Sequence, residues 1–462
     1  MMSKYLLNQW EPENERFWKA SGEQVASRNL WISIPALMLA FIVWSLWSVV
    51  VVNLDKSGFH FTKNELFWLT ALPALSGATL RIFYSFLVPI FGGRRFTAIS
   101  TASLLIPAVG MGFALSDPST SYTTLLVLAL LCGLGGANFS SSMANISFFF
   151  PKARKGFATG MNAGIGNLGV SVVQFVTPIV ISTAVFSGLL GSGQTFVDKG
   201  VEHSIWLQNA GFVWVPLIVV SSLAAWYGMN DIADAKASFR EQAVIFRRAH
   251  NWLMCILYVG TFGSFIGFSA GLALLTKAEF PSINPTAYAF LGPLAGALTR
   301  PLGGWISDRL GGARVTLWTF IAMIAAVFGV IAFLPQGGVG GNFAGFLAMF
   351  VALFALTGIG NGSTFRMIPV IFQTQHQRAA EGKGTAAQQC ALSEANKESA
   401  AVLGFAGAMG AYGGFFIPKG FGTAIAATGS PVAALQAFIG FYVICTLVTW
   451  FFYARRNATM PC

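Results

Sequence analysis

Two stretches of the chain repeat one pattern, and this repeat decides the fold. Residues 300–314 read RPLGGWISDRLGGAR and residues 81–95 read RIFYSFLVPIFGGRR. In each stretch an arginine precedes a Gly-Gly pair at the same spacing, and a basic residue follows the pair. A second match joins GGANF at 135–139 to NGSTF at 361–365. In an apolar chain, such a repeat predicts two homologous bundles whose corresponding residues face each other across a central cavity.

The composition is that of a membrane protein. Of the 462 residues, 55% are hydrophobic and only 10% are charged, and the mean hydropathy is +0.65. A soluble protein would carry about 25% charged residues. The net charge of +11 could suggest a nucleic-acid partner. However, the Lys and Arg residues lie in short clusters between apolar runs, which is the pattern of membrane topology, so we expect no nucleic-acid partner.

The apolar runs predict an all-α polytopic membrane protein with 12 transmembrane helices in two pseudo-symmetric six-helix bundles. Each span needs about 20 mostly apolar residues. We expect spans near 31–53, 66–90, 96–115, 122–148, 157–186, 206–228, 252–275, 285–307, 314–334, 342–372, 398–427 and 431–454. The predicted regions are a cytoplasmic N-terminal segment 1–30, a first bundle 31–228, a cytoplasmic loop 229–251, a second bundle 252–455 and a cytoplasmic tail 456–462.

The positive-inside rule predicts that both termini are cytoplasmic. With that orientation, 20 of the 28 basic residues lie in inside segments and five lie in outside segments. The remaining three are Arg81, Arg300 and Arg366, which fall inside predicted spans.

Arg81 and Arg300 are the strongest candidates for chemistry. A charge deep in a bilayer costs at least about 2.5–3.5 kcal/mol, so it needs a compensating role. Pairing with an intramembrane acid would be one such role, but no Asp or Glu of the sequence falls at mid-membrane depth. We therefore favour an anion site. Arginine grips planar oxyanions with a two-pronged fork, and two such forks favour a small, flat, weakly hydrated monoanion such as nitrate or nitrite.

Other residues could line such a site. Phe139 and Phe262 are candidate walls, although ordinary core packing would account for either ring. Asn167 and Tyr258 could donate hydrogen bonds to the anion, or could instead bond between helices.

Glycines recur at close spacing in the fifth and eleventh predicted spans. Tight helix packing of the GxxxG kind explains such a pattern. The same glycines could also let the helices slide during transport or let the backbone approach the anion, and spacing alone does not separate these interpretations. The glycines concerned are Gly156, Gly160, Gly164, Gly166 and Gly169 in the fifth span, and Gly404, Gly407, Gly410, Gly413 and Gly414 in the eleventh.

Several motifs resemble a known family. GGWISDRLGGAR resembles the loop signature of the major facilitator superfamily, although Pro89 stands in the first half where the second has Asp308. The stretches ALPALSGATLR (71–81), ANFSSSMANISFFFPK (137–152), GMNAGIGNLGVS (160–171), TFGSFIGFSAG (261–271) and GFAGAMGAYGGFFIP (404–418) resemble the NarK-type nitrate/nitrite porters over nearly the whole chain.

The resemblance implies roles for individual residues. Arg81 and Arg300 match the arginines that clamp the anion, and Phe139 and Phe262 match the stacking aromatics. Asn162, Asn167 and Tyr258 match polar lining positions. The glycines around Gly164, Gly166 and Gly169, and around Gly407, Gly410 and Gly413, match the family's paired nitrate signature.

Arg366 and Glu398 form a predicted ion pair on the cytoplasmic side, which could couple transport to protons. By resemblance, some members of the family carry a neutral Gln at the position of Arg366. The alternative is that Arg366 reaches to the interface by itself.

The expected mechanism is alternating access, with nitrate imported in exchange for nitrite. All four histidines fall in predicted loops and no acid reaches the centre, so a proton relay is missing. Moving a monoanion inward against the membrane potential costs about 2.3 kcal/mol per 100 mV, and one-for-one exchange removes that cost. Proton–nitrate symport through Glu398 is the main alternative, and a passive anion channel is another.

No enzymatic constellation is visible in the sequence, and we expect no cofactor and no metal. The expected partners are nitrate, nitrite and the lipid bilayer. We expect a monomer in the bacterial cytoplasmic (inner) membrane.

Overall fold

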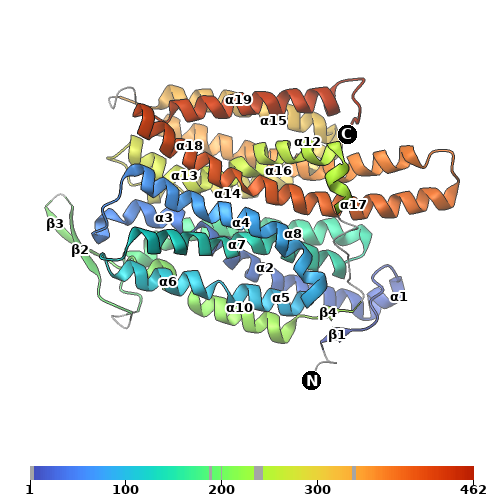
Figure 1. The fold of residues 1–462 in the computed structure, drawn as a ribbon, viewed down its shortest axis with the longest axis horizontal. Helices are drawn as coiled ribbons and strands as arrows, with labels where there is room; N and C mark the ends of the chain where they lie inside the picture. Colours follow the sequence, from blue (N-terminus) through green and yellow to red (C-terminus); the bar gives the residue numbers. More distant parts are fainter. Residues whose placement is uncertain (1–4, 187–189, 199, 234–242, 336–339) are drawn as a thin grey trace. The chain divides into compact units, whose positions relative to one another are not determined.

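The computed structural model describes residues 5–186, 190–198, 200–233, 243–335 and 340–462, and it is dominated by helices (Figure 1). Contacts divide the chain into two compact units. The first comprises Met1–Lys236 and Ser269–Leu294, and the second comprises Ala237–Phe268 and Ala295–Cys462. The segment 269–294 therefore belongs by its contacts to the first unit. The division into a six-helix bundle at 31–228 and another at 252–455 stays a prediction.

The first unit begins with an N-terminal segment that leads into a long helical run. Two small sheets accompany its helices: β1 (Leu6–Leu7) pairs in parallel with β4 (Asp231–Ile232), and β2 (Gln194–Asp198) pairs antiparallel with β3 (Val201–Ile205). The helices are α1 (Glu15–Phe17), η1 (Trp18–Gly22), α2 (Glu23–Ser45), α3 (Trp47–Val50), η2 (Val51–Asn53), η3 (Asp55–Ser57), α4 (Lys63–Phe91), α5 (Gly93–Ala102), α6 (Leu105–Ser116), α7 (Tyr122–Phe149), α8 (Lys152–Ile181), α9 (Asn209–Phe212) and α10 (Val215–Gly228).

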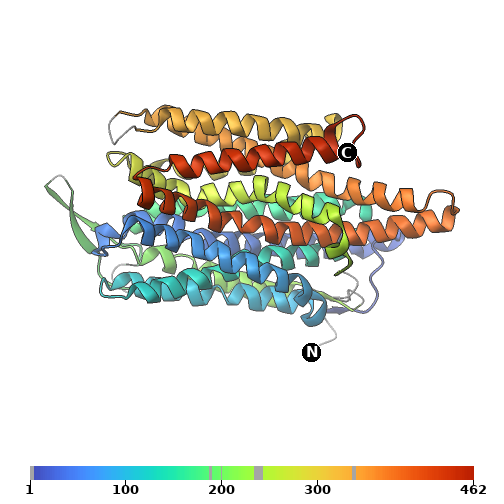
Figure 2. The ribbon, with the colours of Figure 1, turned by 45° about the horizontal axis from the view of Figure 1, so that its top comes forward.

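The rest of the chain is also helical. Figure 2 shows α16 and α17 as an antiparallel pair joined by a short turn. The helices are η4 (Ala243–Arg247), α12 (Ala249–Tyr258), η5 (Val259–Gly263), α13 (Ser264–Glu279), η6 (Pro285–Ala287), α14 (Leu291–Leu310), α15 (Gly312–Phe333), α16 (Phe343–Ala379), α17 (Thr385–Ala411), α18 (Gly413–Thr428), α19 (Val432–Thr449) and η7 (Trp450–Ala454).

Among the described residues, 11 helical runs are long and apolar enough to cross a membrane. They lie at Glu15–Asn53, Lys63–Tyr84, Gly93–Ser116, Tyr122–Phe149, Arg154–Ile181, Asn209–Gly228, Ala249–Glu279, Gly312–Phe333, Phe343–Ala379, Ala387–Thr428 and Val432–Ala454. Each overlaps a predicted span. The eighth predicted span, 285–307, overlaps α14, which is not among these 11 runs. The helix α14 carries the charged residues Arg300, Asp308 and Arg309.

The predicted boundaries miss several features. The first helical run starts well before residue 31, and α16 extends beyond the predicted end at 372. The fifth span ends at Ile181 rather than at 186. The β2–β3 hairpin that follows was not predicted, because its residues carry no strong alternation of apolar and polar side chains.

The two Gly-Gly motifs of the repeat have the same backbone conformation. Gly92 ends α4 with φ 85° and ψ 144°, and Gly311 precedes α15 with φ 87° and ψ 135°. Only glycine adopts such a positive φ with an extended ψ without strain. The second glycine of each pair is buried where a Cβ would collide, with Asn145 at Gly93 and with Met367 at Gly312. The sequence repeat is thus also a structural repeat.

The segment 269–294 is fastened to the first unit by polar bonds. Lys277 Nζ donates to Asp55 Oδ1 at 2.8 Å and to the carbonyl of Val52 at 2.7 Å. Ser171 Oγ donates to the carbonyl of Phe290 at 3.0 Å, and Gln174 Nε2 donates to the carbonyl of Ser269 at 2.8 Å.

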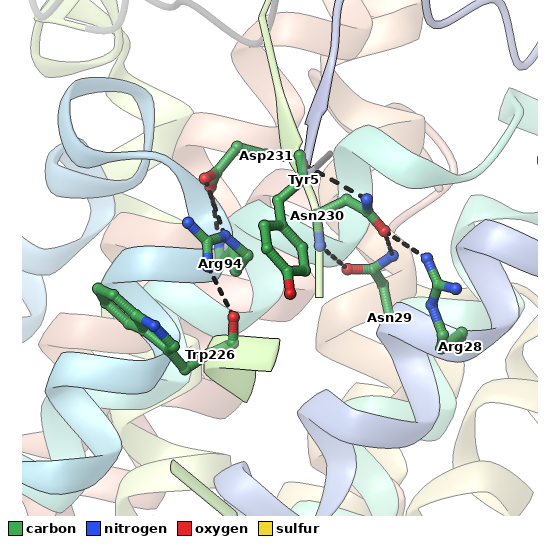
Figure 3. A network of polar contacts seen from close by, with 7 residues as sticks. All are labelled: Tyr5, Arg28, Asn29, Arg94, Trp226, Asn230 and Asp231. Carbon is green, nitrogen blue, oxygen red and sulfur yellow. Dashed lines mark hydrogen bonds and ion pairs between the residues drawn. The ribbon is translucent and has the colours of Figure 1, made fainter. Parts of the chain in front are cut away.

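A polar network ties the N-terminal segment to α5 and α10 in the first unit (Figure 3). Arg94 Nε lies 3.3 Å from Asp231 Oδ2, its Nη1 donates to the carbonyl of Trp226 at 2.6 Å, and its Cζ lies 4.6 Å above the ring of Tyr5. In the first half, which has no acid at Pro89, Asp231 therefore supplies a carboxylate beside the Gly-Gly turn. The network consists of Tyr5, Arg28, Asn29, Arg94, Trp226, Asn230 and Asp231.

Candidate functional site

Arg81 contacts a backbone carbonyl and two aromatic rings inside the first unit. It lies on α4 and is fully buried. Its Nε donates a 2.7 Å hydrogen bond to the carbonyl of Gly136 on α7. Its Cζ lies 4.9 Å from the ring centroid of Trp44 and 4.8 Å from that of Phe139. The guanidinium is thus oriented by cation–π contacts and a backbone bond rather than left to rotate.

Glycines make room for the indole of Trp44. A Cβ at Gly77 would come within 2.8 Å of Trp44 Nε1, and a Cβ at Gly136 would come within 2.6 Å of the indole ring. Trp44 Nε1 donates to the carbonyl of Pro73 on α4 at 2.7 Å. Since both glycines are needed for the indole to fit, the α4–α7 crossing and the surroundings of Arg81 are built together.

Arg300 occupies the corresponding position in the second unit. It lies on α14 and is buried, with 9% of its surface exposed. Its Cζ lies 5.5 Å from the ring centroid of Phe365. Phe365 is the last residue of NGSTF, so it corresponds to Phe139 in the repeat. Arg300 Nη1 is buried and has no hydrogen-bond partner among the residues that the structure describes. A buried cationic donor of this kind calls for an acceptor, and an anion would supply one.

Tyr258 and Phe262 lie together in the second unit. Phe262 falls in η5, a π-helical turn between α12 and α13, and Tyr258 immediately precedes that turn. Both side chains are buried, and their ring centroids are 5.4 Å apart. Single π-helical turns inside α-helices are frequent at functional sites.

Asn162 and Asn167 are buried on α8 in the first unit. Asn162 Nδ2 donates to Ser142 Oγ on α7 at 2.8 Å, so this residue bonds between helices. The Oδ1 atoms of both asparagines lack a hydrogen-bond partner within the described part of the chain. A buried amide oxygen without a hydrogen bond lowers the stability of the fold by about 1–3 kcal/mol, and a hydrogen bond from water or a polar ligand would offset this loss.

The structure separates the glycines into packed and open positions. A Cβ at Gly166 would collide with Leu37, and one at Gly169 with Met38. A Cβ at Gly410 would collide with Tyr258, and one at Gly413 with Gly263. By contrast, a Cβ at Gly164 would meet no described atom within 4 Å. The same holds for Gly156, Gly160 and Gly404. Gly407 lies on α17. Packing therefore explains four of the predicted glycines, and the other interpretations stay open for the four open positions.

The predicted ion pair between Arg366 and Glu398 is wrong. Arg366 Nε instead bonds Asp308 Oδ1 on α14 at 2.9 Å. Glu398 accepts two bonds from Arg248, at 2.8 and 3.0 Å, and lies 3.3 Å from His376 Nε2. The prediction paired Arg366 with Glu398 because both lie at a similar depth in the membrane, but their side chains face different neighbours. The bonds to Glu398 raise the pKa of the Arg248 guanidinium.

The expectation that every histidine lies in a loop is also wrong. His250 lies in α12, where its Nδ1 is 3.0 Å from Tyr453 Oη. His376 lies in α16, is 8% exposed, and has Glu394 at 3.7 Å besides Glu398. The polar end of α16 continues the helix past its apolar part, which hydropathy alone does not show.

Sequence reasoning missed Trp44 and Phe365, which contact the two arginines. Trp44 carried a signal, because tryptophan prefers the membrane interface and this one falls in the middle of a predicted span. Phe365 carried one as well, since the repeat aligns it with Phe139.

Comparison with known proteins assigns the chain to a family. The family model described as Major Facilitator Superfamily matches residues 33–395. This chain belongs to the major facilitator superfamily. Its relatives within the superfamily include the nitrate/nitrite transporter NarU of Escherichia coli K12, with 53% identity over 98% of this chain and 97% of NarU. The probable nitrate/nitrite antiporter NarK2 of Thermus thermophilus shares 41% identity over 99% of this chain and 98% of NarK2.

Structural comparison agrees with the superfamily fold. A bacterial homologue of the human lysosomal transporter Spinster, in an inward-facing and occupied conformation, matches with a TM-score of 0.60. The match covers 92% of this chain and 96% of that protein at 15% identity, so it bears on the fold alone. The predicted major facilitator fold is confirmed. The relatives are transporters, which also confirms the expectation that the chain is not an enzyme.

The ion pairs Arg366–Asp308 and Arg248–Glu398 should contribute unequally to stability. Side-chain exposure is 32% for Arg366 and 68% for Asp308, so Arg366→Gln should cost less than about 1 kcal/mol. Glu398 is only 12% exposed and accepts a two-pronged bond, so Glu398→Gln should cost about 1.5–3 kcal/mol. Thermal unfolding of both variants in detergent checks this order. A larger loss for Arg366→Gln would contradict it.

Proposed function

We propose that this major facilitator transporter carries nitrate and nitrite across the membrane by alternating access. The observation that carries the proposal is a buried arginine at the corresponding position of each unit, with an aromatic ring over each guanidinium. Arg300 Nη1 adds a buried donor without an acceptor among the described residues. The relatives NarU, a nitrate/nitrite transporter, and NarK2, a probable nitrate/nitrite antiporter, support the choice of nitrate and nitrite.

In this proposal, Arg81 and Arg300 clamp the anion. Phe139 and Phe262 stack near it, and Tyr258, Asn162 and Asn167 offer polar contacts. Among the described residues, the Oδ1 atom of each asparagine has no hydrogen-bond partner. Each side-chain amide could rotate to present its Nδ2 to an anion.

For coupling, we propose that imported nitrate is exchanged for exported nitrite. The name of NarK2, a probable antiporter, supports exchange. Glu398 is bonded to Arg248 and lies beside His376, which argues against a carboxyl that gains and loses a proton in every cycle. The His376–Glu398 contact nevertheless keeps proton symport as the second candidate, because it places an imidazole 3.3 Å from the carboxylate.

We also propose that both termini are cytoplasmic and that the protein works as a monomer in a bacterial inner membrane. The distribution of Lys and Arg along the sequence supports this orientation.

Nitrate uptake into proteoliposomes tests exchange. We expect uptake into nitrite-loaded vesicles at symmetric pH, none into empty vesicles, and no stimulation by an inward proton gradient. Uptake into empty vesicles that a proton gradient drives would show symport instead. Uptake into empty vesicles that needs no gradient would show a channel. Glu398→Gln serves as the coupling control, because exchange should survive the loss of its charge.

A further inference from the structure

Trp44 lies in the immediate surroundings of Arg81 and has no role in the function proposed above. Trp44 is 3% exposed, lies on α2, and has the Arg81 Cζ 4.9 Å above its ring. It is itself fixed by the bond from Nε1 to Pro73 and by the close approach of Gly77 and Gly136. A tryptophan held in this way is a rigid face for the guanidinium rather than a mobile filler.

Three contacts together fix the orientation of the Arg81 fork. The bond from Nε to the Gly136 carbonyl sets the direction of the guanidinium plane, because the N–H lies in that plane. The rings of Trp44 and Phe139 then restrict rotation and translation of Cζ. Phe41 packs against both rings, with centroids 5.6 Å from Trp44 and 6.0 Å from Phe139, which stiffens the arrangement.

A fixed fork selects anions by shape. Nitrite offers a single pair of oxygens, so both donors reach it only when the fork is correctly oriented. Perchlorate is also a weakly hydrated monoanion, but its tetrahedral shape offers pairs of oxygens in several directions. Loss of orientation should therefore weaken nitrite binding far more than perchlorate binding.

We propose that Trp44 is a positioning residue that orients the Arg81 guanidinium and so confers selectivity for planar anions, and that Phe365 plays the same part for Arg300. The proposal rests on the proposed function, since it assumes that Arg81 contacts the transported anion. Phe365 enters because its ring lies 5.5 Å from the Arg300 Cζ at the position that corresponds to Phe139.

The test compares two substitutions that separate the ring face from the rest of the side chain. Trp44→Phe keeps a ring face and loses the Nε1 bond, whereas Trp44→Met keeps most of the volume and loses the face. Trp47→Met is the matched control, since Trp47 is a fully buried tryptophan one turn further along the same helical run. The readouts are the KM for nitrite exchange in proteoliposomes and the concentration of perchlorate that halves the rate of nitrite exchange.

We expect Trp44→Met to raise the KM for nitrite about tenfold or more and Trp44→Phe to stay within about threefold. The inhibitory concentration of perchlorate, corrected for nitrite competition, should change by less than about threefold in both. Trp47→Met should keep the KM of the parent protein, whatever its yield.

Three results would overturn the proposal. These are an unchanged KM in Trp44→Met, equal weakening of nitrite and perchlorate, or an equal rise of KM in Trp47→Met. If Trp44→Met does not fold, a KM for Trp44→Phe raised as much as that of Arg81→Lys would also overturn it, because the ring face would then not be what matters. If Arg81→Lys itself transports nitrite normally, the two-pronged grip of Arg81 on the anion is refuted. If the parent protein exchanges no nitrite, the proposed function fails instead.

Discussion

Arg81→Lys should lower nitrate uptake into nitrite-loaded proteoliposomes by about 100-fold or more. The substitution keeps the positive charge but removes the fork. It also removes the Nε donor that bonds Gly136 and the planar group that lies over Trp44 and Phe139. A lysine ammonium is a point charge on a flexible stem, so it can attract an anion without fixing its orientation.

A matched control is available at the other end of the chain. Arg455 also lies over an aromatic ring, with its Cζ 4.1 Å from Phe451, but it is part-exposed at the end of the last helix. Arg455→Lys should retain uptake close to that of the parent protein. Near-normal uptake by Arg81→Lys would show that charge alone suffices and would refute the two-pronged grip.

Gly413→Ala should unfold at a clearly lower temperature than the parent protein, whereas Gly404→Ala should not. The new Cβ at Gly413 would overlap the backbone of Gly263 in η5, and overpacking of this kind costs about 1–3 kcal/mol or more. At Gly404 a Cβ would meet no described atom within 4 Å. Since glycine inside a helix costs about 0.5–1 kcal/mol relative to alanine, Gly404→Ala should be neutral or stabilising.

Thermal unfolding in detergent and transport in vesicles should be measured on the same preparations. A stable Gly404→Ala protein with impaired transport would assign that glycine to helix movement or to close approach of the anion. Equal unfolding temperatures for the two variants would contradict the packing that the structure shows around Gly413.

The sequence sufficed for the features that depend on periodicity and depth. Apolar runs located the spans, and the burial of Arg81 and Arg300 follows from their positions within those runs. The repeat could also be predicted from the sequence, because both copies need a glycine where Gly92 and Gly311 adopt the same positive φ.

Features that depend on helix rotation were not readable in the same way. Arg366 and Glu398 lie at similar depth, but only the facing of α16 toward α14 decides that Arg366 meets Asp308. Likewise, hydropathy shows that α2 is apolar enough to cross a membrane but not that Trp44 faces Arg81 rather than lipid. The polar extension of α16 beyond its apolar part hid His376, whose contact with Glu398 no spacing rule indicates.

The π-helical turn η5 has a consequence for comparing this chain with its relatives. A π-turn holds one residue more than the α-turn it replaces, so deleting a single residue within 259–263 would restore a regular α-helix. The helices on either side would keep nearly the same facing, because the turn absorbs the extra residue, but the side chains within the turn would change neighbours. A relative with a one-residue gap at this point would present other side chains where Tyr258 and Phe262 now meet. In an alignment, the length of this segment therefore carries as much information about the surroundings of Tyr258 and Phe262 as the identity of its residues.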